Sequence, residues 1–343
     1  MGKPLKQAKG EIRTMIDRAE NLLKIAQSQL EDDIINIDSE NMLKISKESI
    51  GASLVISPWN YPLLCPISAI IPSIICGNSV LLKHSPRTPM VGQFFEEAFN
   101  SVGALNVVQN LFLQNSDVEE VYKYPLLNFV GFTGSVEAGK TVLMDIAKNG
   151  RFIRTNFELG GKDAAYVRED ADIDFAVENV IDGAMYNSGQ SCCAIERVYV
   201  HESIYEEFIE KAAKVISNMK LGNPLDESTS LGPQALPDSL VFLQDQVEEA
   251  VSQGAQVICG GTITADSQGK GRFFEPTLLR DCNNDMKIMM RESFGPILPI
   301  SKVSGDDEAI EAINNSEFGL TASIFSRDYK NGQELAKRVF YIF

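Results

Sequence analysis

The chain has 343 residues, of which 44% are hydrophobic and 23% charged, and its formal net charge is −16 at pH 7. A chain of this length is longer than one hydrophobic core usually supports, so two domains are expected in a soluble globular protein. The acidic excess argues against nucleic acid or an anionic membrane surface as a partner, because both carry negative charge themselves. The acidic residues are dispersed along the chain, and we interpret them as a contribution to solubility.

Cysteine and histidine usage narrows the kinds of site that are possible. The cysteines show no CxxC spacing and two of them are adjacent; they are Cys65, Cys76, Cys192, Cys193, Cys259 and Cys282. This pattern fits neither a disulfide scaffold nor a zinc site, and it favours a reducing compartment such as the cytoplasm. With only two histidines, a His-rich metal centre is excluded and no metal is predicted. The start of the chain has no apolar h-region, so a secretory signal is not expected.

The first predicted element is a helix over residues 4–30, where apolar residues recur at helical spacing. Residues 31–49 lose this period and contain two short strand-like runs, which indicate a hairpin. The next apolar stretch, residues 61–82, is interrupted by three prolines. Because proline breaks helices, this stretch predicts a buried helix, a turn and a strand rather than a transmembrane helix.

From Ala52 onward, strand-like runs alternate with helical stretches. The expected strands lie at 54–57, 80–83, 126–131 and 164–167, and the expected helices at 62–75, 88–102, 135–148 and 172–186. This alternation predicts parallel strands joined by crossover helices, that is, an α/β fold. A second alternation follows, with strands at 198–201 and 257–259 and helices at 202–218 and 238–253. We place the boundary between two domains at residues 160–161.

Two glycine-marked motifs contain residue types suited to covalent catalysis. Glu158 opens the motif ELGGKD, and Cys192 lies in the motif NSGQSCC, 34 positions later. A thiol that attacks a carbonyl and a carboxylate that later activates water form a complete mechanism through a thioester. Because the two residues come from different predicted domains, the site is expected in the cleft between them.

Each of these two residues also has an ordinary structural interpretation. Cys192 could be a small buried hydrophobic residue, which is the commonest state of a cysteine outside disulfides. Glu158 could be an exposed residue at a turn. A papain-like thiol hydrolase is disfavoured, because neither His84 nor His201 lies in a supporting motif.

A glycine-rich turn, GFTGS at residues 131–135, follows a predicted strand and precedes a predicted helix. Such a turn presents backbone N–H groups and a helix dipole to a phosphate. Residues 134–141 also match the P-loop pattern GxxxxGK[ST]. A nucleotide hydrolase is disfavoured, because Glu137 would bring negative charge into the phosphate cradle and the thiol and carboxylate motifs would stay unexplained. We therefore expect the second half of the pattern to continue the helix.

Asn60 follows the first strand of the predicted sheet, next to the chain's one tryptophan, Trp59. An amide N–H at the carboxyl end of a strand can donate to a developing oxyanion. A plain turn residue in the segment SPWNYP is an equally good interpretation. Lys83, at the end of the next strand, and Glu292, which opens the segment ESFGP, are ordinary surface charges when each is considered alone.

Taken in chain order, these motifs resemble the NAD(P)-dependent aldehyde dehydrogenase superfamily. The resemblance covers nearly the whole chain, and its most specific elements are ELGGK at Glu158 and GQSC at Cys192. It implies a Rossmann-type parallel-sheet cofactor domain over residues 1–160 and a second α/β catalytic domain over residues 161–343. It also implies an oligomerising hairpin within residues 31–49. The implied activity is oxidation of an aldehyde to a carboxylic acid with NAD or NADP.

The resemblance implies roles for the matching positions. Cys192 is the nucleophile, Glu158 the general base for hydrolysis, and Asn60 with the backbone N–H of Cys192 the oxyanion hole. The implied cofactor contacts are Lys83 at the adenosine ribose, Gly134 and Ser135 at the pyrophosphate, Glu292 at the nicotinamide ribose, Phe294 at the nicotinamide, and in addition Gly160 and Trp59. Cys193 is expected to be a bystander.

Two departures from the family pattern bear on these expectations. The usual glutamate three residues after the Lys83 position is replaced here by Pro86, with Arg87 beside it. Without that carboxylate a 2′-phosphate meets less repulsion, so NADP is an alternative to NAD. Relatives are also expected to begin upstream of Met1 and to continue past Phe343, into a segment that closes the substrate tunnel and a strand that pairs with a neighbouring subunit.

Three functions therefore stay open, with a small-molecule aldehyde as the expected substrate and a homo-oligomer as one option for the assembly. The preferred one is an active aldehyde dehydrogenase. The second is a truncated, catalytically impaired paralogue that acts as a binding or structural subunit. The third, an acylating relative that passes the acyl group to coenzyme A, is disfavoured because Glu158 is present to drive hydrolysis.

Overall fold

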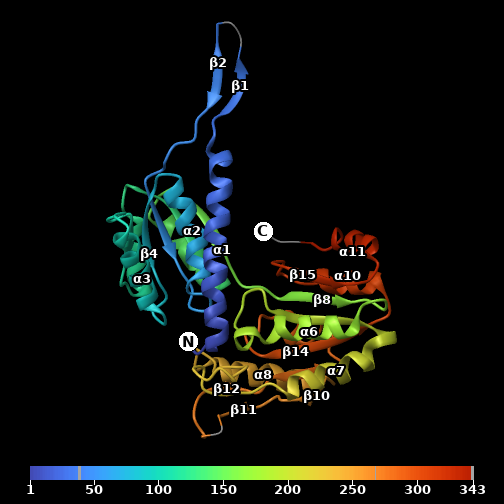
Figure 1. Cartoon of the computed structure of the whole chain (residues 1–343). Helices are drawn as coiled ribbons and strands as arrows, with labels where there is room; N and C mark the ends of the chain where they lie inside the picture. The colour runs from blue at the N-terminus through green and yellow to red at the C-terminus, as the bar shows by residue number, and fades with distance from the viewer. Residues whose placement is uncertain (38–39, 267, 341–343) are drawn as a thin grey trace. The chain divides into compact units, whose positions relative to one another are not determined.

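The computed structural model describes residues 1–37, 40–266 and 268–340, and its chain forms two compact units. Unit 2 comprises residues 9–159, and unit 1 comprises the first eight residues together with the chain from Gly160 onward. The division therefore differs from the predicted one mainly at the start of the chain. Each unit contains its own sheet of mostly parallel strands covered by helices, which is the predicted α/β class (Figure 1).

Helix α1 (Leu5–Leu30) confirms the first predicted element. It leads into an antiparallel pair of strands, β1 (Asp33–Ile37) and β2 (Met42–Ile45), so the predicted hairpin is also confirmed. Every residue of both strands is exposed, and Figure 1 shows the pair standing clear of the sheet of its own unit. The tip of the hairpin, residues 38–39, lies outside the described residues.

The sheet of unit 2 has five parallel strands in the order β5-β4-β3-β6-β7. These are β3 (Ala52–Ile56), β4 (Ser79–Lys83), β5 (Val108–Asn110), β6 (Leu127–Thr133) and β7 (Arg154–Glu158). The chain runs outward from β3 through β4 to β5 and then returns to β6 on the other side of β3. This reversal is a topological switch point, where the carboxyl ends of β3 and β6 meet beside a crevice that suits ligands.

Short helices connect the strands of unit 2. They are α2 (Leu64–Ile75), α3 (Pro89–Ser101), the 3₁₀ turn η1 (Asn115–Asp117), α4 (Val118–Tyr122) and α5 (Val136–Lys148). Two apolar clusters, one on each face of the sheet, hold these helices in place, because burying the apolar residues of β3 and β4 removes them from water. The apolar stretch 61–82 forms α2, a turn and β4, as its prolines predicted. Within the described ranges, no helix combines the length and the apolar character needed to cross a membrane.

The larger sheet, in unit 1, has six strands in the order β10-β13-β14-β9-β8-β15, of which β10 alone runs antiparallel to its neighbour. The strands are β8 (Asp163–Val167), β9 (Ile195–His201), β10 (Gln256–Cys259), β13 (Thr277–Arg280), β14 (Ile297–Val303) and β15 (Ala322–Phe325). A separate antiparallel pair consists of β11 (Ile263–Thr264) and β12 (Phe273–Phe274). Sequence patterns predicted β8, β9 and β10 but none of the strands after residue 261.

Helices cover both faces of this sheet. They are α6 (Ile173–Met185), η2 (Tyr186–Gly189), η3 (Glu202–Ile204), α7 (Tyr205–Ser217), α8 (Ser239–Ser252), α9 (Lys287–Met290), α10 (Asp306–Asn314) and α11 (Tyr329–Ala336). Alternate residues of β8 point to opposite faces: Ala164 and Tyr166 pack with α8 and α10, and Ala165 and Val167 with α6 and α7. The middle strands are thus buried on both sides, so their ends hold a fixed position.

Candidate active site

The cysteine loop, residues 186–193, begins where α6 ends. Asn187 and Ser188 have φ angles of 52° and 57°, and Gly189 follows with 72°. The left-handed region is costly for a residue that carries a Cβ, so two consecutive such residues need support from their surroundings. They turn the chain sharply toward Cys192, which is half-buried, and Cys193, which is exposed.

Hydrogen bonds within the loop and to the segment 232–234 supply that support. The Ser188 hydroxyl donates to the Gly232 carbonyl oxygen at 2.8 Å, and the Gln234 amide donates to the Ser188 carbonyl oxygen at 3.1 Å. Gln190 donates to the Asn187 carbonyl oxygen at 2.9 Å. The carbonyl oxygens of Asn187 and Ser188, the two left-handed residues, are therefore both bonded to side chains, which stabilises the strained conformation.

The two adjacent thiols interact with each other. A hydrogen bond with Cys192 lowers the pKa of the Cys193 thiol to about 6; burial acts in the opposite direction, and a hydrogen bond with Ser191 lowers it further. Two thiols that interact in this way titrate as a pair and not as two independent groups. A thiolate is the reactive form of cysteine, which makes this loop suited to nucleophilic attack.

The two glycines of the ELGGKD motif meet the cysteine loop and Glu292. A Cβ added to Gly160 would lie 2.5 Å from the Glu292 carboxylate, and one added to Gly161 would collide with the Cys192 carbonyl oxygen. The Gly161 N–H donates to Glu292 Oε1 at 3.2 Å. At position 161 only glycine permits the approach, because the atom met belongs to the backbone, whereas a side chain at position 160 would displace the Glu292 carboxylate. The glycine pair thus lies where three separate sequence motifs come together in unit 1.

The next residue of the motif, Lys162, is fully buried. Its ammonium donates to Glu196 Oε2 at 2.7 Å and to the Ser293 hydroxyl at 3.0 Å. Burial lowers the pKa of Lys162, and the charge of Glu196 opposes that shift. The pair ties the start of β8 to β9 and to the Glu292 loop, residues 291–296.

Two carboxyl groups beside this pair have raised pKa values. Burial raises the pKa of Glu292 to about 7, and the charge of Glu196 adds to the effect. Burial likewise raises the pKa of Asp163 to about 7, although its hydrogen bonds with Thr321, at 3.0 and 2.5 Å, favour the ionised form. Clusters of shifted groups at the end of a sheet are typical of functional sites.

In unit 2, the loop after β3 carries Trp59 and the buried Asn60. Two side chains from other elements hold the backbone of residues 62–64 in place. The Glu11 carboxylate accepts the N–H groups of Leu63 and Leu64 at 2.8 and 3.2 Å, and the imidazole of His84 lies 2.9 Å from the Pro62 carbonyl oxygen. This support favours a fixed position for Asn60 at the carboxyl end of the sheet. Neither Glu11 nor His84 was predicted to have this role.

The turn after β6 places Gly134 and Ser135 at the start of α5. The Ser135 hydroxyl caps the helix by accepting from the Ala138 N–H at 3.3 Å. Lys140 lies on the exposed surface of α5 and pairs with Glu137 at 2.9 Å. Because α5 begins at Val136, residues 136–138, which would lie in the phosphate-binding loop of a P-loop, are helical, and this argues against the P-loop interpretation.

Glu158 and Lys83 end two further strands of this sheet. Glu158 closes β7 opposite Thr133, its side chain is exposed, and its carbonyl oxygen accepts from the Gly134 N–H at 3.0 Å. Lys83 is buried, which lowers the pKa of its amine, and the amine donates to Asn115 of η1. Both side chains thus lie at the carboxyl edge where the switch point predicts a ligand.

The predicted site residues form one group in each unit. Unit 1 brings together Cys192, Gly160, Glu292 and Phe294; unit 2 places Asn60, Trp59, Lys83, Gly134, Ser135 and Glu158 along one sheet edge. The sequence interpretation missed Glu196 and gave Lys162 no role. One feature could have drawn attention to Glu196: it directly precedes the predicted strand 198–201, and an ionisable residue is almost never fully buried without a partner.

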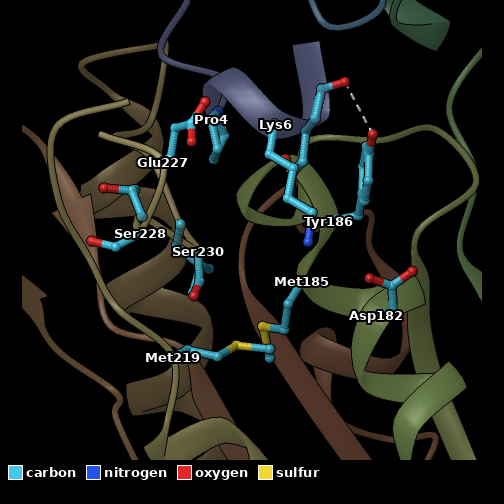
Figure 2. A pocket seen from close by; sticks show the side chains of 12 residues that line it. Pro4, Lys6, Asp182, Met185, Tyr186, Met219, Glu227, Ser228 and Ser230 are labelled. Carbon is cyan, nitrogen blue, oxygen red and sulfur yellow. Dashed lines mark hydrogen bonds between the residues drawn. The ribbon is translucent and has the colours of Figure 1, made fainter. Parts of the chain in front are cut away.

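A pocket of about 440 Å³ lies in unit 1, next to the start of the cysteine loop (Figure 2). Lys6 and Gln7 of the first turn of α1 form one wall, and the loop 227–231 forms another. The Tyr186 hydroxyl donates to the Gln7 carbonyl oxygen at 3.3 Å, the contact drawn in Figure 2. In the same view, Met185 and Met219 approach each other at the base. The volume suits a small organic molecule.

Comparison with known proteins identifies the family. The model of the aldehyde dehydrogenase family matches residues 1–341. The chain belongs to the aldehyde dehydrogenase family. The sequence resemblance and the α/β fold with parallel sheets are thereby confirmed.

Several relatives in the family are similar over almost the whole of this chain. It is 34% identical over 341 residues to the succinate-semialdehyde dehydrogenase [NADP(+)] of Deinococcus radiodurans, covering 99% of this chain and 70% of that protein. It is 33% identical to the lactaldehyde dehydrogenase of Escherichia coli, covering 95% and 68%. The structure of succinic semialdehyde dehydrogenase from Streptococcus pyogenes in complex with NADP⁺ matches with a TM-score of 0.92 at 32% identity, covering 99% of this chain and 74% of that one.

Proposed function

We propose that this chain oxidises an aldehyde to a carboxylic acid, with NAD or NADP as hydride acceptor and Cys192 as nucleophile. One observation carries the proposal: Gly160 and Gly161 lie directly against Glu292 and the backbone of Cys192. This contact brings the cysteine loop, a carboxyl group with a shifted pKa and the two glycines of the ELGGKD segment together in unit 1. Membership of the aldehyde dehydrogenase family supports the same reaction class.

The residues present fit a nicotinamide dinucleotide. Unit 2 offers a parallel-sheet switch point and a helix N-terminus, where a Cβ on Gly134 would lie 2.6 Å from the Phe132 ring. Lys83, Gly134, Ser135 and Trp59 would hold the cofactor from unit 2, and Gly160, Glu292 and Phe294 from unit 1. When bound, the cofactor accepts a hydride. Pro86 in place of the usual carboxylate, and the NADP⁺ in two of the relatives named above, favour testing NADP beside NAD.

The chain's own residues supply the covalent steps. The Cys192 thiolate adds to the aldehyde carbon, and the oxygen that becomes negative accepts N–H groups from Asn60 and the Cys192 backbone. Loss of hydride from that carbon leaves a thioester. Glu158 then removes a proton from water, the hydroxide attacks the thioester, and the carbon–sulfur bond breaks to return the thiolate and release the acid.

Assembly is the second part of the proposal. The hairpin β1–β2 exposes six large apolar side chains, a patch that a soluble monomer rarely presents; they are Ile34, Ile35, Ile37, Met42, Leu43 and Ile45. We infer that a second copy of the chain covers them. The reducing compartment expected from the cysteine pattern stays a prediction.

Reduced-cofactor formation tests the activity. Purified protein is incubated with NAD⁺ and, separately, with NADP⁺ and a panel of aldehydes, while absorbance at the reduced nicotinamide band is followed. We expect reduced cofactor to form with the wild type and with the control Cys76→Ala. The control alters an exposed thiol in unit 2, whereas Cys192 belongs to unit 1. Cys192→Ala should lower kcat by about 10³-fold or more.

The same experiment distinguishes the proposed activity from the alternative function. A catalytically impaired relative that serves as a binding or structural subunit yields no reduced cofactor with any aldehyde, and Cys192→Ala then changes nothing. The chain spans about 70% of the length of the Deinococcus radiodurans relative.

A further inference from the structure

Glu196 is a buried charged residue near the start of a central strand of the unit 1 sheet. It lies on β9, between β14 and β8, and only 2% of the residue is exposed. A carboxylate in such a place persists only if its charge and its lone pairs are satisfied. Lys162 supplies the counter-charge at 2.7 Å.

Two further acceptor positions of Glu196 are taken by the Glu292 loop. The N–H of Ser293 donates to Oε2 at 2.7 Å, and the N–H of Phe294 donates to Oε1 at 2.8 Å. Residues 291–296 are all described and contain no helix or strand. The two N–H groups that follow Glu292 are thus held by a side chain from another element.

Phe294 needs such a restraint. Its φ angle is 55°, and a bulky residue in the left-handed region is a clear outlier. Strained residues persist where the surroundings over-determine them, and they cluster at functional sites. Here the restraint is the pair of hydrogen bonds to Glu196, with the Lys162 bond to the Ser293 hydroxyl beside them.

We propose that Glu196 is a positioning residue: held by Lys162, its carboxylate fixes residues 292–294 so that Glu292 and Phe294 are presented to the nicotinamide end of the cofactor in one conformation. This proposal rests on the proposed function, which places those two residues at the cofactor. Glu196 itself does not touch the reacting atoms.

The charge of Glu196 has a second effect, on the titration of Glu292. The groups that face Glu292 are Glu196 from β9, Lys162 just before β8 and Asp163 at its start. Burial is the largest cause of its raised pKa of about 7, and the charge of Glu196 is the next. An ionised Glu292 is the better acceptor for ribose hydroxyls. The affinity of the wild type for the cofactor should therefore decrease as the pH is lowered from about 7. Removing the Glu196 charge lowers the Glu292 pKa and moves this loss to lower pH.

The test is cofactor affinity, measured by titration calorimetry on the full chain between pH 5.5 and 9. Glu196→Gln keeps the shape but turns one acceptor into a donor. The double variant Glu196→Gln with Lys162→Met also removes the buried ammonium that the single change leaves without a counter-charge, which protects the fold. Both should bind the cofactor about tenfold to a hundredfold more weakly at pH 9. The acid-side loss should move to lower pH in Glu196→Gln and less far in the double variant, because Lys162 also lowers the Glu292 pKa.

Two further variants separate position from charge. Glu196→Asp keeps the charge but shortens the side chain, so it should retain the wild-type pH profile with an intermediate affinity. Glu206→Gln removes a different ion-pair carboxylate of unit 1, which accepts from Arg280 at 2.9 and 2.8 Å, and should bind as the wild type does.

Wild-type affinity and pH profile in Glu196→Gln would overturn the inference. So would an equal loss in all Glu196 variants with no movement of the pH profile, because that is the pattern of a general structural defect. A wild-type protein that binds neither NAD⁺ nor NADP⁺ overturns the proposed function, and the inference with it, before any variant is compared.

Discussion

The two units hold their candidate residues by different physical means. In unit 2 the residues follow directly from strand ends and a capped helix, and Ser135 has an ordinary φ of −71°. In unit 1, left-handed residues form the loops. Among the described residues, positive φ outside glycine occurs at Asn106, Asn187, Ser188, Asp281 and Phe294. Three of these five lie in the cysteine and Glu292 loops, so backbone strain is concentrated where the thiol and Glu292 are held.

The two units also differ in the charged residues that they bury near their candidate sites. Unit 1 encloses Lys162, Asp163 and Glu196 within a few residues of its loops, whereas the turn at Gly134 in unit 2 presents backbone groups and a hydroxyl. Charged groups in a low-dielectric interior respond to pH, while backbone groups do not. The unit 1 loops should therefore be sensitive both to small steric changes and to protons, whereas the Ser135 cap in unit 2 should not respond to protons because it contains no titratable group.

The largest expected effect is steric, at Gly189. An added Cβ would collide with the Gly295 carbonyl oxygen, and the φ of 72° is itself unfavourable for alanine. Gly189→Ala should cost about 3 kcal/mol of unfolding free energy, from overpacking added to backbone strain, and should abolish activity. The matched control in unit 2 is Gly150→Ala, with a φ of 66° and nothing within 4 Å of the added Cβ; it should cost about 1 kcal/mol. Equal costs in urea denaturation would remove the contrast between the units.

The next effect is a pH dependence of stability from Asp163. Burial raises its pKa from 3.8 to about 7, so the folded state binds the proton more tightly than the unfolded state does. The group therefore destabilises the fold progressively as the pH rises from about 4 to 7. Between pH 5 and 7 the wild type should lose about 2 kcal/mol more than Asp163→Asn in urea denaturation. The control, Asp285→Asn at an exposed site, should keep the wild-type slope; an unchanged slope in Asp163→Asn would contradict the assignment.

In unit 2, removal of the cap of α5 should have a smaller and purely local effect. Ser135→Ala loses the acceptor for the Ala138 N–H and should reduce the unfolding free energy by about 1 kcal/mol at every pH. Ser101→Ala, which removes an exposed hydroxyl from the last turn of α3, should stay within about 0.5 kcal/mol of the wild type. A pH-dependent cost for Ser135→Ala would show that the two units are less different than proposed.

The smallest effect on stability is expected at the hairpin of unit 2. Ile35→Asp places a charge in the exposed apolar patch, so it should change the unfolding free energy of the separate chain by less than about 0.5 kcal/mol. It should nevertheless lower the mass seen by sedimentation if a second copy covers the patch. Leu225→Asp, at an exposed apolar site of unit 1, is the control. A wild-type chain that sediments as a monomer would overturn the assembly proposal.

Local patterns in the sequence were sufficient for much of the fold. The period of residues 4–30 predicted α1, and alternating runs predicted β3, β4, β6 and α5 with boundaries within two residues. After residue 261 the strands are short, and β11 and β12 have two residues each. No period can be recognised in so few residues, so this part of the sheet could not be predicted.

The sequence by itself determined the chemistry available: a thiol and a carboxylate in glycine-marked motifs, and strand-to-helix turns that suit a dinucleotide. Turn residues and apolar periods act over a few neighbours, so they are visible in the chain. Only the tertiary structure decided which groups meet. Gly161 and Glu292 are 131 positions apart, and Glu196 and Ser293 are 97 apart. Their contacts exist because buried strands bring distant segments to one edge, where an isolated charge or glycine acquires a partner.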